Sequence, residues 1–328
     1  MIRLRWIIVG CLVCTQLVAS FLEDDYLILS NTPESFLAPG LVYQGIMPSS
    51  VRILYYHKNI YQSDLHYEIT VKNTSPDPIS VDLLKGLSGP NPDGLFVGHK
   101  ATVSFLEKGM TNAYDRIHLL PGEVATLIRH PVKPDHVISG FLKIKSDAHP
   151  HVYLRIRIID QMLSHMAGLD YEMGTQLYES NIVPSFLSSK VTFSATSPIR
   201  ELSLGQFPYV KDIVDGTPLK GNYGVAYEFF VTLTNPTTET RDIVLLFSPV
   251  GGMARATLII DDELVQTGLV DHRTDHRPTE IKRFRLTANE TRRVTIYTMP
   301  QPGAYYPVNL ILSTDHPTYK SMVLKERK

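Results

Sequence analysis

The sequence contains very little cysteine or tryptophan. Its two cysteines, Cys11 and Cys14, and its one tryptophan, Trp6, all lie close to the N-terminus. The rest of the chain can form no disulfide and carries no cysteine nucleophile. It also lacks the buried Trp and the paired Cys of antibody-type domains, which disfavours that subtype.

Common catalytic motifs and an excess of charge are missing as well. The chain has no H-E-x-x-H, G-x-S-x-G, P-loop or Rossmann glycine pattern. Its 32 basic side chains are balanced by 33 acidic ones, which gives no electrostatic reason to expect a nucleic acid as a partner. These absences favour a noncatalytic protein without a cofactor. A glycosidase stays open as an alternative, because the fold can pair two carboxylates that are distant in sequence.

The first 20 residues have the composition of an export signal. Arg3 and Arg5 precede a mostly apolar run over residues 6–18, and Val18-Ala19-Ser20 supplies small residues for a signal peptidase. A membrane anchor normally needs about 20 apolar residues, so we expect cleavage, with retention or lipidation at Cys11 as alternatives. No later run is long enough to span a bilayer. The mature chain is therefore expected to be secreted, periplasmic or at the cell surface, and the lack of disulfides suits a bacterial envelope.

One strand pattern occurs twice in the chain. Apolar residues alternate over residues 65–73 and again over residues 227–235, each time followed by a polar turn and a second alternation. The matching positions are Leu65, Tyr67, Ile69, Val71 and Asn73, and Tyr227, Phe229, Val231, Leu233 and Asn235. A repeat of this kind predicts a duplicated β unit.

The length and the repeat together predict two domains. The 328 residues fit roughly two domains of about 150 residues each. We expect a first β-sandwich domain with an N-terminal leader over residues 21–159 and a second over residues 198–328. Residues 160–197 lose the alternation and are expected to form a linker.

Short alternations and turn residues predict individual elements. A strand is expected over Ala101–Leu106, and a hairpin from Phe141–Lys145 and Val152–Ile159. Leu120-Pro121-Gly122-Glu123 is typical of a tight turn, and Asp261-Asp262-Glu263 of a hairpin turn.

The segments over residues 67–73 and 229–235, with the turn at residues 120–123, resemble immunoglobulin-like or fibronectin-type-III-like domains of exported bacterial proteins. The resemblance implies an all-β fold of two tandem immunoglobulin-like β-sandwich domains. It also implies the roles such domains often have, namely spacing, adhesion, sugar binding or assembly.

Two features of the second half predict a contact site for a ligand or partner. The glycine pair at residues 251–252 permits close backbone approach, although such glycines more commonly serve a bend or bulge. Adjacent tyrosines, at residues 305–306 as at residues 55–56, are expected to send one ring into the core and one outward. The candidate contact residues are Gly251, Gly252, Arg255, Tyr305 and Tyr306.

A metal site is a further hypothesis. Asp271, His272, Asp275 and His276 offer carboxylate and imidazole ligands within six residues. Two arginines interleave with them and Pro278 follows, so a solvated loop is the simpler interpretation.

These expectations favour a noncatalytic exported protein that acts as a structural, adhesive or assembly module through protein contacts. A carbohydrate-binding accessory protein of polysaccharide turnover is the alternative, because outward tyrosines suit sugar stacking. The expected partner is a protein or a surface glycan of the cell envelope. A pilus-type chaperone is a third candidate, for which the chain is large.

Overall fold

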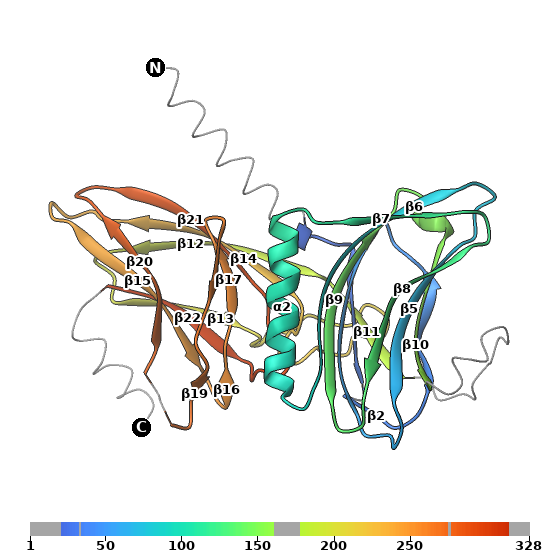
Figure 1. The fold of residues 1–328 in the computed structure, drawn as a ribbon. Coiled ribbons are helices and arrows are strands. Elements are labelled where there is room, and N and C mark those ends of the chain that lie inside the picture. The colour runs from blue at the N-terminus through green and yellow to red at the C-terminus, as the bar shows by residue number, and fades with distance from the viewer. Residues whose placement is uncertain (1–20, 33, 161–177, 275–276, 315–328) are drawn as a thin grey trace.

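The structure is a computed structural model that describes residues 21–32, 34–160, 178–274 and 277–314. The expected signal peptide at residues 1–20 lies outside the described residues. No helix within the described ranges has the length and apolarity needed to cross a membrane. The chain is mostly β and forms two lobes on either side of a long helix (Figure 1).

Two sheets form the first lobe. Its strands are β1 (Tyr26–Thr32), β2 (Ser35–Phe36), β3 (Gly40–Ile46), β4 (Ser50–Asn59), β5 (Leu65–Asn73), β6 (Ile79–Asn91), β7 (Asp115–Leu119), β8 (Val124–Val132), β9 (Val137–Lys145), β10 (Val152–Asp160) and β11 (Glu179–Val183). One sheet has the order β11-β1-β4-β9-β6-β7, with β2 beside β4, and the other has the order β3-β10-β5-β8. A single apolar core with side chains from both sheets fills the space between them.

The second lobe also contains two main sheets. Its strands are β12 (Phe186–Ser194), β13 (Ile199–Leu204), β14 (Ala226–Thr234), β15 (Arg241–Pro249), β16 (Met253–Ala254), β17 (Thr257–Ile260), β18 (Glu263–Gln266), β19 (Val270–Asp271), β20 (Thr279–Leu286), β21 (Thr291–Thr298) and β22 (Val308–Thr314). The orders are β12-β14-β21-β17-β18 and β13-β22-β15-β20, and β16 pairs separately with β19.

The strands of the sequence repeat occupy matching places in the two lobes. β5 lies between β10 and β8, as β14 lies between β12 and β21, and β6 and β15 each lie between two antiparallel neighbours. Among these matching places the direction of one neighbour differs, because β10 runs antiparallel to β5 whereas β12 runs parallel to β14. The predicted duplication of a β unit is therefore present in the fold.

The last residue of β5 and the residue after β14 are asparagines, and each holds together the turns at that end of its lobe, here called the corner. The Asn73 amide donates to the carbonyls of Asp77 (2.8 Å) and Leu119 (3.1 Å), and Asn235 donates to Glu239 (2.8 Å) and Leu286 (3.2 Å). A glutamate completes each corner, since Glu123 accepts from the Leu120 amide as Glu290 does from the Thr287 amide. The predicted turn at residues 120–123 is confirmed, and residues 287–290 are its counterpart.

The first-lobe sheet that contains β4 is apolar on both faces, because each face packs against a different apolar cluster. Val51, Ile53 and Tyr55 point into the core of the first lobe. Leu54, on the opposite face, joins the apolar cluster of the second lobe together with Leu27 and Leu29 of β1. The two lobes thus share one continuous apolar cluster at their junction, and this burial fixes their relative orientation.

The strand expected over residues 101–106 is wrong, because α2 (Gly94–Met110) occupies this region. Asp93 caps the helix by accepting from the Phe96 amide at 3.0 Å. The helix is buried between β6 and the second lobe, so its apolar residues cover a wide arc and the helical period is hard to see in the sequence. Gly86 of β6 permits this packing, since a Cβ there would lie 2.3 Å from the Phe105 backbone nitrogen.

Two further expectations about connections are corrected. β9 and β10 belong to different sheets, so the predicted hairpin is a crossing between sheets through η1 (His149–His151).

The expected linker over residues 160–197 contains β11, which pairs with β1 of the first lobe, and β12, which pairs with β14 of the second. β12 is an edge strand with three consecutive exposed residues, so its alternation is weak. Residues 161–177 lie outside the described residues.

Insertions at equivalent places meet at the junction. α2 lies between β6 and β7 in the chain, and residues 250–278, which include β16 to β19, lie between the matching strands β15 and β20. Gly98 of α2 packs against the loop after β21, where a Cβ would lie 1.9 Å from the Pro302 carbonyl oxygen. The two insertions also contact each other, since His99 Nε2 of α2 lies 2.9 Å from Gln266 Oε1 of β18, and they contribute to the contact between the lobes together with β1 and β4.

Candidate functional site: a pocket at the junction

A pocket of about 390 Å³ opens where the two lobes meet. The first lobe contributes residues of β1 and β4, the chain after β1 and the first turn of α2. The second lobe contributes β16 and two loops, one at Tyr223 and one over residues 302–305. The lining residues are Leu29, Asn31, Glu34, Leu54, Tyr56, Leu95, Tyr223, Met253, Pro302, Gly303, Ala304 and Tyr305. This volume lies in the range of small-ligand sites.

The polar groups of the pocket are largely uncommitted. The carboxylate of Glu34 and the hydroxyls of Tyr56 and Tyr305 form no hydrogen bond or ion pair with the described residues. By contrast, the Tyr223 hydroxyl donates to the Ala304 carbonyl at 3.1 Å, which holds that ring in the wall. A bound molecule would find free donors and acceptors here.

The electrostatic environment of the pocket is negative. Burial, with the nearby charges of Glu34 and Asp93, raises the pKa of Tyr56 to about 12. Burial and Glu34 also raise the pKa of Tyr223. Among the described residues that line the pocket there is no lysine, arginine or histidine, so their formal charge is −1.

Three of the sequence-predicted contact residues come together at this wall. Gly251 and Gly252 pack on the ring of Tyr305, and a Cβ on Gly252 would lie 2.9 Å from the Tyr305 side chain. Gly252 also has a φ of +55°, which disfavours other residues. The Tyr305 amide donates to the carbonyl of Met253 at 2.9 Å. The glycine pair thus serves as a close-packed bend that positions a pocket tyrosine.

Arg255 and Tyr306 do not line the pocket. Tyr306 is buried behind it and packs edge-to-face on Tyr223, while Tyr305 is half exposed. One ring is therefore buried and the other faces outward, as predicted, although these residues form a loop rather than a strand. The same division holds in β4, where Tyr55 is in the core and Tyr56 lines the pocket.

His99 of α2 links the lobes beside Arg255. Its Nδ1 lies 3.2 Å from Gln301 Oε1 and its Nε2 lies 2.9 Å from Gln266 Oε1. Burial and the charge of Arg255 lower the pKa of His99, which favours the neutral imidazole. Its role is to connect α2 with the insertion of the second lobe.

The hypothetical metal motif is only partly described. The carboxylate of Asp271 is paired with Arg273, whose guanidinium donates to both oxygens at 3.0 and 2.9 Å. Asp275 and His276 lie outside the described residues, so the complete set stays a prediction. Elsewhere in the described chain no three His, Cys, Asp or Glu side chains are grouped as a metal site would need.

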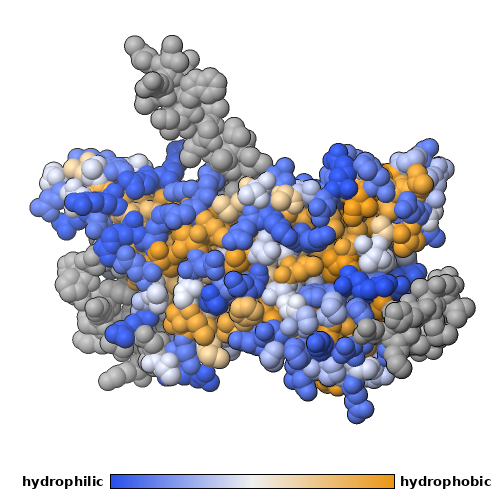
Figure 2. Space-filling view, viewed as in Figure 1, coloured by the Kyte–Doolittle hydropathy of each residue, from blue (hydrophilic) through white to orange (hydrophobic). Residues whose placement is uncertain are grey.

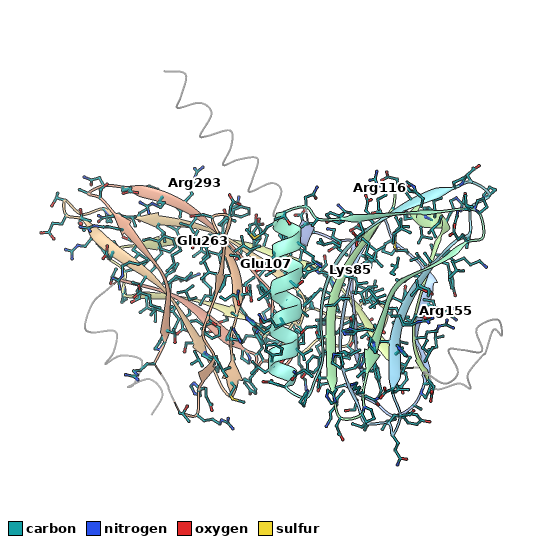
Figure 3. The ribbon with its side chains drawn as sticks, in the orientation of Figure 1. Lys85, Glu107, Arg116, Arg155, Glu263 and Arg293 are labelled. Carbon is teal, nitrogen blue, oxygen red and sulfur yellow. The ribbon has the colours of Figure 1, made fainter. Side chains whose placement is uncertain are left out.

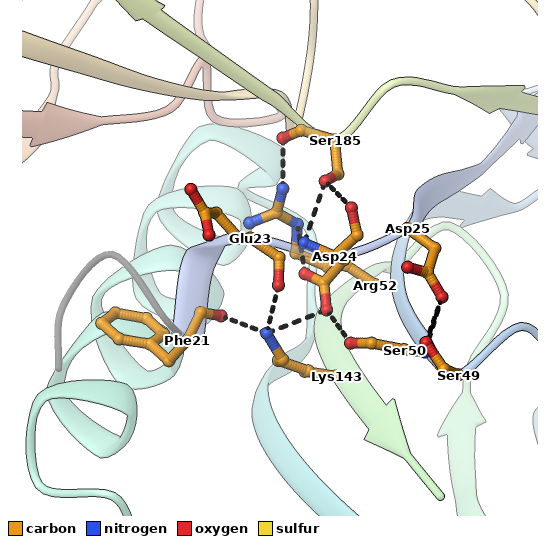
Figure 4. Close-up of polar contacts among 9 residues, drawn as sticks. All are labelled: Phe21, Glu23, Asp24, Asp25, Ser49, Ser50, Arg52, Lys143 and Ser185. Atoms are coloured by element: carbon orange, nitrogen blue, oxygen red, sulfur yellow. Dashed lines mark hydrogen bonds and ion pairs between the residues drawn. The ribbon is translucent and has the colours of Figure 1, made fainter. Parts of the chain in front are cut away.

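A buried ionic cluster lies at the junction beneath the N-terminal segment (Figure 4). Asp24 pairs with Lys143 at 2.9 Å and lies 3.8 Å from Arg52, and all three side chains are almost completely buried. Lys143 also donates to the carbonyls of Phe21 and Glu23, and the Ser185 hydroxyl donates to the Asp24 carbonyl. The cluster ties the start of the described chain to both lobes.

Some other charged side chains are also buried, such as Glu68, which pairs with Arg129 and Arg157, whereas others lie on the outside of the lobes. The labelled residues in Figure 3 include Arg116, which pairs with Asp82, and Glu107 on the exposed face of α2. Figure 2 shows apolar surface interspersed among hydrophilic atoms on this face of both lobes. The exposed apolar side chains Met253 and Tyr305 belong to the pocket.

Sequence reasoning missed most of the pocket. Asn31, Glu34 and Tyr223 lie far from Tyr305 in the chain, and only the packing of the two lobes brings them together. Tyr56 could be predicted in part, because the adjacent tyrosines at residues 55–56 of a strand must place one ring in the core and the other on the outward face. The strand alternation could not show that the outward face of β4 is covered by a second lobe.

Comparisons with known proteins give distant similarity. No family model and no curated protein matches the chain. Among solved structures, the chain is similar to an anti-sigma factor domain-containing protein (11% identity, 90% of this chain and 95% of that one, TM-score 0.23). It is also similar to an anti-sigma factor domain-containing protein from Clostridium clariflavum (12% identity, 89% and 93%, TM-score 0.18). A CBM22 tandem domain of Paenibacillus barcinonensis Xyn10C is a third (11% identity, 80% and 82%, TM-score 0.16). Scores this low carry no argument about function.

Proposed function

We propose that the chain is an exported, noncatalytic protein with two tandem immunoglobulin-like β-sandwich domains. It acts at the cell envelope or outside the cell as an adhesive or assembly module that binds a protein partner. The observation that carries this proposal is the junction, where two lobes with a shared apolar cluster hold an open pocket in fixed geometry. A preformed pocket binds without the cost of ordering its walls.

The chemistry of the pocket supports binding rather than catalysis. In the part of the lining that the structure describes, Glu34 is the one carboxylate, and besides it only tyrosines are titratable. General acid and base catalysis by two carboxylates would need a second acid at a defined distance. Free hydroxyls and a free carboxylate beside apolar walls are suited to recognition.

A pull-down from the native host, with the protein tagged and exported, tests this function. Three baits are compared: the wild type, Met253→Asp in the pocket wall, and Phe207→Asp as a matched exposed position outside it. We expect one stoichiometric partner to be retained by the wild type and by Phe207→Asp and lost with Met253→Asp. Recovery of no partner, or its loss only with Phe207→Asp, would contradict the proposal.

A carbohydrate ligand is the second candidate, and the pocket itself supports it. Tyrosine rings next to an amide and a carboxylate, here Tyr305, Asn31 and Glu34, can stack on a sugar and hydrogen-bond its hydroxyls. Isothermal titration with soluble cell-wall oligosaccharides is the test. Titrations without heat or a change in melting temperature would rule this candidate out.

A further inference from the structure

The pocket combines apolar walls with one unpaired negative charge. Leu29, Leu54, Leu95 and Met253 form apolar parts of the lining. Glu34 is exposed, and its carboxylate has no partner among the described residues. A ligand that satisfies both features needs an aliphatic part and a positive end.

The aromatic residues favour the same chemistry. Tyr56, Tyr223 and Tyr305 all line the pocket, and the face of a tyrosine ring attracts an ammonium or guanidinium group. Because the lining holds no basic residue, a phosphate or carboxylate ligand would meet Glu34 with no compensating cation. Anionic ligands are therefore disfavoured by the same arrangement that favours a cation.

We propose that the junction pocket receives a lysine or arginine side chain presented by the partner protein. The stem packs on Leu95 and Met253, the lining residues with accessible apolar surface, and the cationic head lies between the tyrosine rings and the carboxylate of Glu34. This rests on the proposed function, because it names the chemistry of the partner at the same site. Charge complementarity selects this occupant over a neutral one.

The test is a titration of a capped Gly-Gly-Lys-Gly-Gly peptide into the full-length protein, followed by NMR. We expect saturable shifts at pocket residues, which weaken when sodium chloride is raised because the head group pairs with an accessible carboxylate. Glu34→Gln should weaken binding by up to about fivefold, as expected for loss of one exposed ion pair. The same peptide with norleucine in place of lysine should not bind.

Glu107→Gln is the matched control, since this glutamate is exposed on α2, about 18 Å along the helix from Leu95. It should leave the affinity unchanged. Equal binding of the lysine and norleucine peptides, or an unchanged affinity in Glu34→Gln, would overturn the inference. Two other outcomes would also overturn it: n-butylamine binding as tightly as the peptide, which indicates a site for free amines, or saturation by a neutral trisaccharide alone.

The pull-down separates this inference from the function on which it rests. If Met253→Asp loses the partner while Glu34→Gln retains it at wild-type yield, the assembly function stands and the cationic anchor is rejected. If no partner is recovered with any bait, the assembly function itself fails, whatever the peptide does.

Discussion

Asp24 shows how much of the junction depends on one side chain. Its carboxylate is the anion between Lys143 and Arg52, and burial lowers the pKa of Lys143 to about 8 despite the favourable charge of Asp24. Two cations are thus held beside one anion in a region without solvent. Such a cluster is sensitive to loss of its anion, because an unpaired buried charge is costly.

Asp24→Asn should therefore destabilise the protein by about 3–5 kcal/mol. Asp25→Asn is the matched control, because Asp25 is exposed and bonds only Ser49 and Ser50 in the described contacts. It should destabilise by only about 0.5–1.5 kcal/mol, because the amide oxygen of the new asparagine can still accept a hydrogen bond. Urea denaturation of both variants measures this, and equal midpoints would refute the role given to Asp24.

At the scale of elements, α2 is the piece on which both lobes pack. Gly86 lets β6 approach one side of the helix, and Gly98 lets the loop with Pro302 approach the other. Both contacts are with backbone atoms, which cannot rotate away as a side chain can. Glycine at positions 86 and 98 therefore allows α2 to lie this close to β6 and to the Pro302 loop.

Gly98→Ala tests this spacing. In a solvated helix the change would stabilise by about 1 kcal/mol, whereas here the Cβ would force the Pro302 loop outward and destabilise by about 1–3 kcal/mol. Gly268→Ala serves as the control, because a Cβ at Gly268 meets no atom within 4 Å. Thermal unfolding compares the two, and a Gly98→Ala variant more stable than the wild type would show that the loop yields freely.

Elements with a local sequence pattern could be predicted, whereas features that depend on how the two lobes pack could not. β5 and β14 follow a period of two with a terminal Asn, so local pattern was enough to place them, and the turn at Asp261 and Asp262 between β17 and β18 was also predicted correctly. The immunoglobulin-like topology stays a proposal. α2 was missed because burial on both sides gives it apolar residues around much of its circumference. The pocket was mostly missed because it depends on how two lobes pack, which no local period encodes.

At the scale of the whole molecule, stability should depend on pH through buried histidines. Burial lowers the pKa of His99 at the junction, where Arg255 and Lys100 add to the effect, and burial also lowers that of His130 in the first lobe. The unfolded chain, with histidine pKa values near 6.5, binds these protons more readily than the folded chain. The stabilising contribution is complete above about pH 6.5 and is lost as pH falls through the folded-state values.

The free energy of unfolding should accordingly fall between pH 7.5 and pH 5.5, a range above most carboxylate titrations. A His99→Gln, His130→Gln double variant should show a smaller fall, although its stability at pH 7.5 is lower. Guanidinium titrations at several pH values measure both slopes. An identical pH dependence in the double variant would show that other groups cause it.

The buried position of Asn73 matters for the choice of a host in which to produce the protein. Asn73-Thr74-Ser75 and Asn289-Glu290-Thr291 are both acceptor sequences for N-linked glycans. Asn289 lies in an exposed turn with a φ of +58° and has room for a glycan. Asn73 is fully buried, and its amide nitrogen already donates two hydrogen bonds. A glycan on this nitrogen would replace a donor hydrogen and would not fit the buried site, so the turn forms as described only when Asn73 is unmodified.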